Sequence, residues 1–308
     1  MTDQESRDIL NSEPWIWFVG LATMDVIQRV ENWPSPNDKV TSTWQEVAPG
    51  GPATNAALAC SALGGKSRLG TGLGLGTVGA TIFNTLETRD VTVDDWAPKE
   101  AMPSLSSIIL TGDTGARAIV SSDATGMDLS PPEIPPDLAN CAALLLDGHH
   151  PRIARWAAGM AHEKGVRVIL DAGRWKPVME VLLPLADDVV CSADFTVPGT
   201  TDRQSMMDEI LRRGTRRVAV TDGAGPIAWR ERGQNDGEIT GGEIQVPTVT
   251  AVDTLAAGDV FHGAYVYAVA QLQLAFAPAL ELASEVAACK VQRLGQQEWL
   301  KALENYPM

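Results

Sequence analysis

The second half of the chain alternates short, continuously apolar segments with helical segments, and this alternation constrains the fold most. Strands that are apolar throughout and alternate with helices are typical of a parallel sheet that is covered on both faces. Ligands of such sheets bind at the carboxyl ends of the strands. We therefore expect an α/β core, with strands at 143–146, 166–170, 188–190 and 218–220 and helices at 151–164, 175–185 and 203–214.

Two regions outside this pattern alternate polar and apolar residues, as half-exposed strands do. They span about residues 24–48 and 104–122. We expect them to pair as a small separate sheet that serves as a lid or as an edge. Exposed strand edges often pair across a dimer, so the lid strands are the predicted contact of a homodimer.

The length of 308 residues suits one large α/β domain, which we place at 14–308 behind a flexible leader of residues 1–13. The leader is polar and acidic, unlike a signal peptide, and no stretch approaches 18 consecutive apolar residues. The four cysteines are far apart, which favours reduced thiols over a disulfide framework or a zinc site. These features predict a cytoplasmic protein without a membrane partner.

The charge balance excludes one class of partner. The chain has 24 Lys and Arg against 39 Asp and Glu, a formal net charge of −15. A nucleic-acid binder needs a basic face, so we expect no nucleic acid partner. An anionic small molecule stays allowed, because backbone dipoles and a bound metal ion override the global sign locally.

The most informative motif is the segment 252–264, VDTLAAGDVFHGA, in which small residues lead into a helix. Small side chains at Ala256, Ala257 and Gly258 expose backbone N–H groups, and such a helix N-terminus binds anions, phosphate above all. Asp259 follows in the first helical turn, where a carboxylate can take a proton from a nucleophile that attacks a bound phosphoryl group. The alternative is an acidic residue that merely complements the helix dipole.

Two further segments accompany this motif. Residues 50–64 read GGPATNAALACSALG, a glycine turn followed by a helix of small residues, and residues 220–225 read VTDGAG, a turn after a buried strand. Together with the segment 252–264, they resemble the signatures of the ribokinase-like (PfkB-type) family of carbohydrate and nucleoside kinases. The resemblance runs from about Trp15 to Gly295. It implies a three-layer α/β/α core with a mostly parallel sheet and a small β-sheet lid.

The resemblance also implies roles for single residues. The position of Asp259 resembles that of the family's catalytic base. The backbone at Ala256, Ala257 and Gly258 resembles the family's anion hole. The acceptor-binding positions are Asp25, Gly50, Gly51 and Asn55; the nucleotide-binding positions are Thr221, Gly223 and Gly225; Asp253 matches the position that holds a monovalent cation, K⁺ being the candidate. Arg117, on a lid strand, is a candidate contact for an anionic group on the acceptor, with a solvated surface arginine as the alternative.

Each of these residues also has a purely structural interpretation. Asp25 is then an ordinary exposed strand residue, and residues 50–51 and 221–223 are ordinary turns. The chain also departs from the family pattern. Ala256 stands where glycine is usual, which leaves the anion hole intact if its φ is negative. Ser192 and Phe195 replace an Asn and Glu pair that helps to organise magnesium, and Asp194 is the candidate substitute.

A GxGxxG match at 74–79 suggests a dinucleotide site, which also needs an acidic residue at the end of the next strand. Asp94 and Asp95 lie at a suitable distance, but no clear apolar strand precedes them, so we expect no such site.

The sequence therefore predicts a phosphotransferase that uses ATP and Mg²⁺ to phosphorylate a hydroxyl of a small sugar or sugar derivative, with Asp259 as base. One alternative is a nucleoside kinase of the adenosine type. Another, from a different class, is a non-catalytic sensor of sugars or nucleotides on the kinase scaffold.

Overall fold

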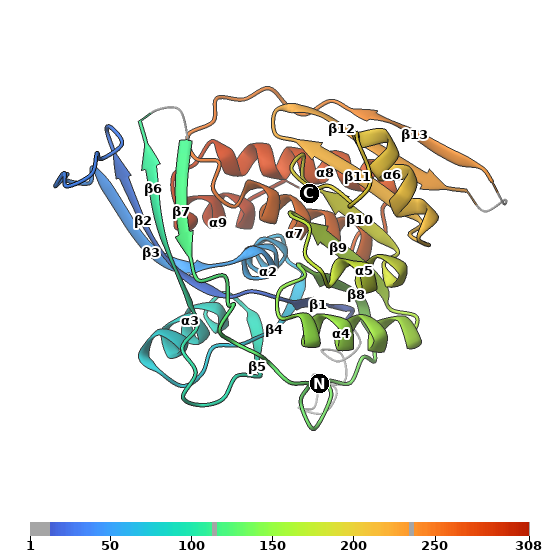
Figure 1. Cartoon of the computed structure of the whole chain (residues 1–308), viewed down its shortest axis with the longest axis horizontal. Coiled ribbons are helices and arrows are strands. Elements are labelled where there is room, and N and C mark those ends of the chain that lie inside the picture. The colour runs from blue at the N-terminus through green and yellow to red at the C-terminus, as the bar shows by residue number, and fades with distance from the viewer. Residues whose placement is uncertain (1–12, 113–115, 234–236, 308) are drawn as a thin grey trace.

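The computed structural model describes residues 13–112, 116–233 and 237–307. The expected leader at 1–13 thus lies almost wholly outside the described residues. Most of the chain builds one large sheet with helices on both faces, and a smaller sheet stands to one side of it, which confirms the expected fold class (Figure 1).

The larger sheet has nine strands, parallel except at one edge, where β11, β12 and β13 pair antiparallel. In β1, Ile16 and Phe18 point into the core on one face, and Trp17 and Val19 into the core on the other. Burial on both faces explains why these strands are continuously apolar. In spatial order they are β13 (Ile239–Ile244), β12 (Gly225–Arg232), β11 (Arg217–Asp222), β10 (Asp188–Cys191), β9 (Arg167–Ala172), β8 (Cys141–Leu146), β1 (Trp15–Val19), β4 (Lys66–Thr71) and β5 (Val91–Asp95).

The helices divide between the two faces of this sheet. One face is covered by α2 (Pro52–Ala62), α3 (Thr77–Glu87), α7 (Ala257–Ala270), α8 (Phe276–Val291) and α9 (Gln296–Glu304). The other is covered by α4 (Pro151–Glu163), α5 (Met179–Leu182), the 3₁₀ turn η1 (Leu183–Leu185) and α6 (Arg203–Arg212).

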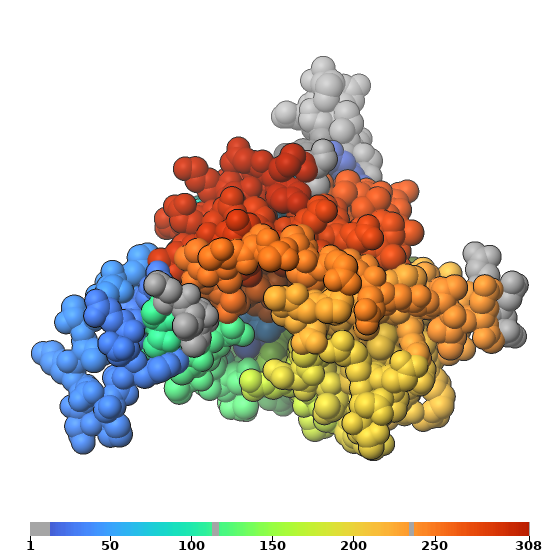
Figure 2. All heavy atoms as spheres, turned by 90° about the horizontal axis from the view of Figure 1, so that it is seen from above, coloured from blue at the N-terminus to red at the C-terminus, as the bar shows by residue number. Residues whose placement is uncertain are grey.

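The smaller sheet joins the two regions of alternating sequence. Its strand order is β3 (Trp44–Gly50), β2 (Thr23–Val30), β6 (Ser104–Thr111) and β7 (Ala116–Ser121). The central pair, β2 and β6, is parallel, and both outer pairs are antiparallel. In Figure 2 the blue atoms of β2 and β3 project to one side of the red C-terminal helices. We call this sheet the lid.

The structure corrects one detail at the GxGxxG match. Asp94 and Asp95 do end a strand, β5, which forms the edge of the large sheet. Asp94 binds the guanidinium of Arg68 through two hydrogen bonds of 2.6 and 2.8 Å, and Asp95 accepts the backbone N–H of Gly74 at 2.9 Å. Both carboxylates are thus engaged with the protein's own groups.

Candidate active site

Helix α7 begins behind a turn of small residues, and within the described chain no side chain caps it. The Ala257 N–H reaches the carbonyl of Thr254 only at 3.3 Å. The space beside Gly258 is open, since a Cβ built there would meet no atom within 4 Å. Uncapped N–H groups with open space beside them favour a bound anion.

The backbone of Ala256 does not meet the condition of a negative φ under which the anion hole was expected to stay intact. Ala256 has φ 58° and ψ 13°, the left-handed conformation, which costs an alanine roughly 1–2 kcal/mol. The turn is held because the Asp253 carboxylate accepts the N–H of Leu255 at 2.8 Å. The N-terminus of α7 therefore keeps its shape at the expense of local strain.

Asp259 meets Asn55 across the crossing of α7 and α2. The Asn55 amide Nδ2 donates to the Asp259 carboxylate Oδ2 at 2.8 Å. The approach depends on Gly263, whose added Cβ would come within 2.3 Å of the Ala56 carbonyl oxygen. Asn55 is held in turn by Gln296, whose side-chain Nε2 lies 3.4 Å from the Asn55 Oδ1. The two residues predicted to serve the reaction thus lie in direct contact.

The Asp259 carboxyl group has a raised pKa. Burial and the nearby Asp171 carboxylate raise it to about 6, while the hydrogen bond from Asn55 and the charge of His262 lower it. His262 lies on α7, three residues after Asp259, with Nε2 3.5 Å from Asp171 Oδ1 and Nδ1 2.7 Å from the Gly258 carbonyl. A carboxylate whose pKa is near the working pH is suited to accept a proton.

Asp25 lies on β2 of the lid, buried against the glycine pair at the end of β3. Its Oδ1 accepts the hydroxyl of Thr23, and burial raises the pKa of its carboxyl group. A Cβ on Gly50 would come within 1.9 Å of the Asp25 Oδ2. Gly51 has φ 100°, and a Cβ there would come within 2.4 Å of the Leu21 carbonyl oxygen. Both positions therefore require glycine.

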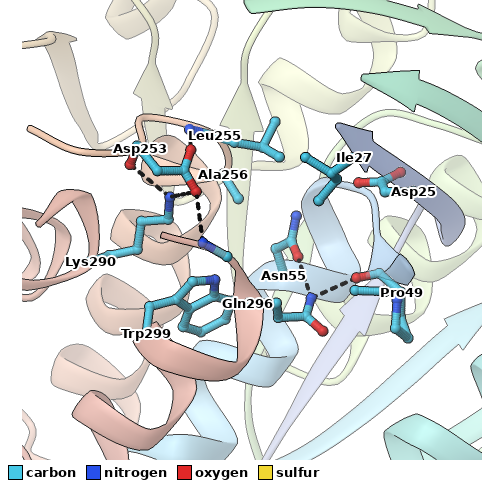
Figure 3. Close-up of a pocket in the computed structure, with 12 residues that line it drawn as sticks. Asp25, Ile27, Pro49, Asn55, Asp253, Leu255, Ala256, Lys290, Gln296 and Trp299 are labelled. Atoms are coloured by element: carbon cyan, nitrogen blue, oxygen red, sulfur yellow. Dashed lines mark hydrogen bonds and ion pairs between the residues drawn. The ribbon is translucent and has the colours of Figure 1, made fainter. Parts of the chain in front are cut away.

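A pocket between the lid and the C-terminal helices brings several of these residues together (Figure 3). Carboxylate, amide and ammonium groups converge there with a similar number of apolar side chains, a mixture that suits a small ligand with polar groups. The lining residues are Asp25, Ile27, Ala48, Pro49, Asn55, Asp253, Leu255, Ala256, Lys290, Gly295, Gln296 and Trp299.

Arg117 lies outside that lining and reaches from the lid strand β7 to the turn before α7. Its Nη1 donates to the hydroxyl of Thr254 at 2.9 Å. The contact joins the lid to the turn that precedes α7.

The candidate nucleotide residues lie at the carboxyl end of β11. The Thr221 hydroxyl donates to the Cys191 carbonyl at 3.3 Å, and Gly223 has φ 55°, which turns the chain into β12 at Gly225. Residues 222–224 are exposed. The turn is thus open to a ligand. It lies at the edge of the sheet at which α7 begins.

The three residues at the candidate magnesium positions have different surroundings. Ser192 donates its hydroxyl to the Gly173 carbonyl at 2.7 Å, Phe195 is buried in the core, and Asp194 is exposed. Across residues 13–112, 116–233 and 237–307, no three His, Cys, Asp or Glu side chains form a cluster that would hold a metal ion. The Asp253 carboxylate lies 3.2 Å from the ammonium of Lys290.

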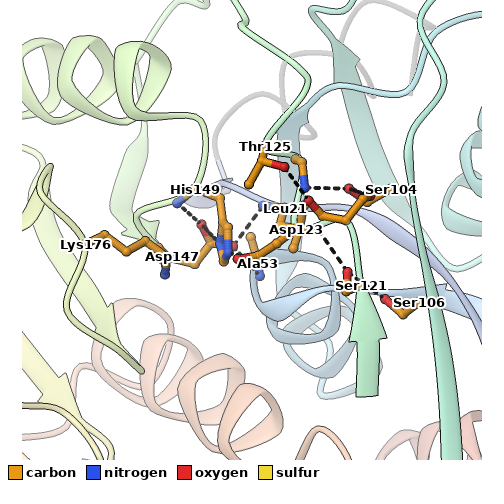
Figure 4. A network of polar contacts seen from close by, with 12 residues as sticks. Leu21, Ala53, Ser104, Ser106, Ser121, Asp123, Thr125, Asp147, His149 and Lys176 are labelled. Carbon is orange, nitrogen blue, oxygen red and sulfur yellow. Dashed lines mark hydrogen bonds and ion pairs between the residues drawn. The ribbon is translucent and has the colours of Figure 1, made fainter.

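The sequence places Asp147 and His149 at the end of a strand, but it does not show the charged network that they form there after β8 (Figure 4). The Asp147 carboxylate accepts the N–H groups of Leu21 at 2.8 Å and Ala53 at 3.2 Å, which ties the chain entering the lid to the start of α2. His149 lies 3.1 Å from Asp147 and 3.0 Å from Asp123, which follows lid strand β7. An acidic residue that ends a buried parallel strand was the available signal.

Comparisons with known proteins agree with this arrangement. The model of the pfkB family carbohydrate kinases matches residues 15–302. A ribokinase of Haemophilus influenzae is 24% identical over 305 residues, covering 93% of this chain and 97% of the relative. A crystal structure of a candidate ribokinase from Agrobacterium tumefaciens superposes with a TM-score of 0.82 at 28% identity, covering 96% of this chain and 97% of that one.

A ribokinase of Arabidopsis thaliana, solved in complex with ribose and ATP, has the same fold, with a TM-score of 0.73 at 22% identity and coverage of 96% and 100%. No helix in the described part of the chain is both long and apolar enough to cross a bilayer. The match of the family model over nearly the whole chain, on a fold shared with solved ribokinases, shows that this protein belongs to the pfkB family of carbohydrate kinases.

Proposed function

We propose that the protein transfers the terminal phosphoryl group of ATP to a hydroxyl of a small sugar or sugar derivative. The observation that carries this proposal is the contact between Asn55, which lines the pocket, and Asp259, in the first turn of a helix whose N-terminus is uncapped. Family membership supports the reaction class. The ribose and ATP in the Arabidopsis thaliana structure support the choice of substrates.

The acceptor sugar lies between lid and core in this proposal. Asp25 accepts hydrogen bonds from sugar hydroxyls, and Asn55 offers both a donor and an acceptor. Gly50 and Gly51 let the backbone approach the ligand closely. Of the described residues that line the pocket, Trp299 alone is aromatic, which favours a sugar over a nucleoside of the adenosine type, whose base needs aromatic stacking.

Asp259 then acts as the base. Its carboxylate takes the proton of the acceptor hydroxyl as the oxygen attacks the terminal phosphorus of ATP, and the bond from that phosphorus to the bridging oxygen of ADP breaks. The backbone N–H groups of residues 256–258 stabilise the negative charge of the transferred group. Thr221, Gly223 and Gly225 bind the rest of the nucleotide.

Magnesium would enter with the nucleotide, whose phosphate charge it neutralises. Mg²⁺ bound to a nucleotide commonly takes only one or two protein carboxylates and keeps several waters. Asp194, which is exposed after β10, is the carboxylate that would hold it in that way.

The assay that tests the proposal is ADP release over a panel of pentoses, hexoses and nucleosides with Mg²⁺ present. Turnover of at least one sugar is the expected result. The buried Phe195 and the strained Ala256 favour a second candidate, a non-catalytic sensor of sugars or nucleotides. Tight binding of a sugar without any ADP release would favour the sensor.

We further propose that residues 14–308 act as one cytoplasmic kinase unit, and that two copies pair through their lids. The outer face of the lid supports the pairing. Val26 is paired with Val47 on one side and with Ser107 on the other, and Ser107 is paired with Val120. The three valines are 39, 64 and 74% exposed in the order Val26, Val47 and Val120. Val47→Lys together with Val120→Lys should convert a dimer into a monomer in light scattering. A wild-type protein that is monomeric at micromolar concentration would contradict this pairing.

A further inference from the structure

Lys290 is a buried cation beside the active-site turn. It lies near the end of α8 and is 1% exposed. Its Nζ donates to the Asp253 carbonyl at 2.8 Å and lies 3.2 Å from the Asp253 Oδ2 (Figure 3). An ammonium is held in the interior only where oxygen atoms replace its hydration shell, and here one residue supplies both oxygens.

The same residue, Asp253, organises the turn that leads into α7. Its Oδ1 accepts the N–H of Leu255 at 2.8 Å, and its Oδ2 accepts the N–H of Gly295 at 3.2 Å. Its own N–H donates to the carbonyl of Val291 at 3.1 Å. The ammonium thus sits where the end of α8 meets the turn that ends at Ala256, the residue before α7.

These contacts would compete with the free monovalent cation that was expected at Asp253. Potassium is bound by carbonyl and carboxylate oxygens, and the ammonium of Lys290 already uses the carbonyl and one carboxylate oxygen of this residue. A lysine ammonium is a compact point charge with three donors, which makes it a chemical substitute for such an ion.

We propose that Lys290 is a built-in replacement for a monovalent cation, so that the anion-binding turn is ordered without K⁺. Lys290 is a positioning residue: it acts through Asp253 on the backbone at 253–256 and does not touch the substrate. The proposal rests on the proposed kinase function only for its effect on turnover, because the order of the turn is measurable without any substrate.

The kinetic experiment compares ADP release in buffer whose only cation besides Mg²⁺ is tetramethylammonium with the same buffer plus 100 mM KCl. The wild-type rates should agree within about twofold. Lys290→Ala should lose roughly tenfold or more without K⁺, because the turn is displaced, and recover on addition of K⁺ or NH₄⁺. Lys290→Met fills the space without a charge and should not recover. Lys301→Ala, at an exposed lysine of α9, is the matched control.

The thermal experiment measures Tm without sugar or nucleotide. Lys290→Ala should melt about 10 °C below the wild type, because Asp253 keeps a buried charge without a partner. Addition of K⁺ should restore about 5 °C of this loss. The same addition should not change the Tm of the wild type, of Lys290→Met or of Lys301→Ala. This measurement decides the proposal even if no sugar is turned over.

Two results would overturn the proposal. One is a wild-type rate that rises severalfold, or a wild-type Tm that rises by several degrees, when K⁺ is added to the tetramethylammonium buffer. The other is a folded Lys290→Ala variant whose Tm does not respond to K⁺ or NH₄⁺. If Lys290→Ala does not fold, the wild-type comparison and Lys290→Met still decide between a built-in cation and a free one.

Discussion

The side chains of Asn55 and Asp259 are separated by 204 positions in the sequence and joined by one hydrogen bond of 2.8 Å. Asn55 lies in the first turns of α2 and Asp259 in the first turn of α7. The bond therefore sets the position of the proposed base relative to the helix that faces the acceptor pocket. It also favours the ionised form of Asp259, because an amide donor stabilises a carboxylate.

This bond predicts a shift in the pH profile. The pKa of Asp259 is raised to about 6, so kcat/KM of the wild type should fall as pH drops through about 6 and the base becomes protonated. Asn55→Ala removes the donor that lowers this pKa, so the midpoint of the acidic limb should move to higher pH. The midpoint is read from rates at pH 5 to 8, separately from any loss of maximal rate. A midpoint that moves to lower pH would contradict the assignment of Asp259 as base.

The close crossing of α2 and α7 predicts that Gly263 does not tolerate a larger side chain. Gly263→Ala places a Cβ 2.3 Å from the Ala56 carbonyl oxygen, so the two helices must separate. We expect a loss of at least about 2 kcal/mol in the free energy of unfolding, together with a lower kcat. Gly159→Ala on α4 is the matched control, because its Cβ would meet no atom within 4 Å. Equal stability of the two variants in urea melts would show that the helices are not this close.

The strain at Ala256 predicts a stabilising substitution. Ala256→Gly removes the steric cost of φ 58° and should stabilise the protein by about 1 kcal/mol, or raise Tm by about 2 °C. The neighbouring Ala257→Gly lies at the first residue of α7 and relieves no strain, because the φ of Ala257 is not positive. It should lower Tm slightly instead, because glycine loses more backbone entropy on folding. The opposite order of the two Tm values would place the strain elsewhere.

The contact of His149 with Asp147 and Asp123 predicts a stability that depends on pH. Burial lowers the pKa of His149, but the Asp147 charge and the hydrogen bonds outweigh it and raise the pKa to about 9. The stabilisation is therefore fully present below pH 6.5 and is lost as pH rises through about 9, at most about 3 kcal/mol in total.

Urea unfolding at pH 6.5, 8 and 9.5 measures this dependence. His149→Gln should remove most of the slope over that range, and Asp123→Asn, which leaves the Asp147 contact intact, should remove a smaller part. A wild-type stability that rises between pH 6.5 and 9.5 would show that the imidazole is neutral in the folded protein.

The sequence was informative where one local pattern determines the structure. Continuously apolar strands such as Leu144–Leu146 are buried on both faces, so their pattern alone predicts the parallel sheet. The small residues at 256–258 predict an exposed helix N-terminus in the same way. Strand β5 was missed because it is a short edge strand whose alternation covers only a few residues.

Contacts between distant segments were not accessible to the same reasoning. Lys290 lies in α8 among small and apolar residues, and nothing in that segment shows that its ammonium meets a carbonyl 37 positions earlier. The sign of φ at Ala256 was left open by the sequence for a related reason. The left-handed turn is imposed by the contacts of Asp253 with α8 and with Gly295, which no local propensity contains.

Asp259→Asn tests most directly whether Asp259 takes the proton from the acceptor. The change keeps the size of the side chain and removes the base. We predict that ADP release with the best sugar of the panel falls at least about 100-fold, while the affinity for an ATP analogue stays within about twofold. A variant that turns over the sugar at close to the wild-type rate would contradict the account.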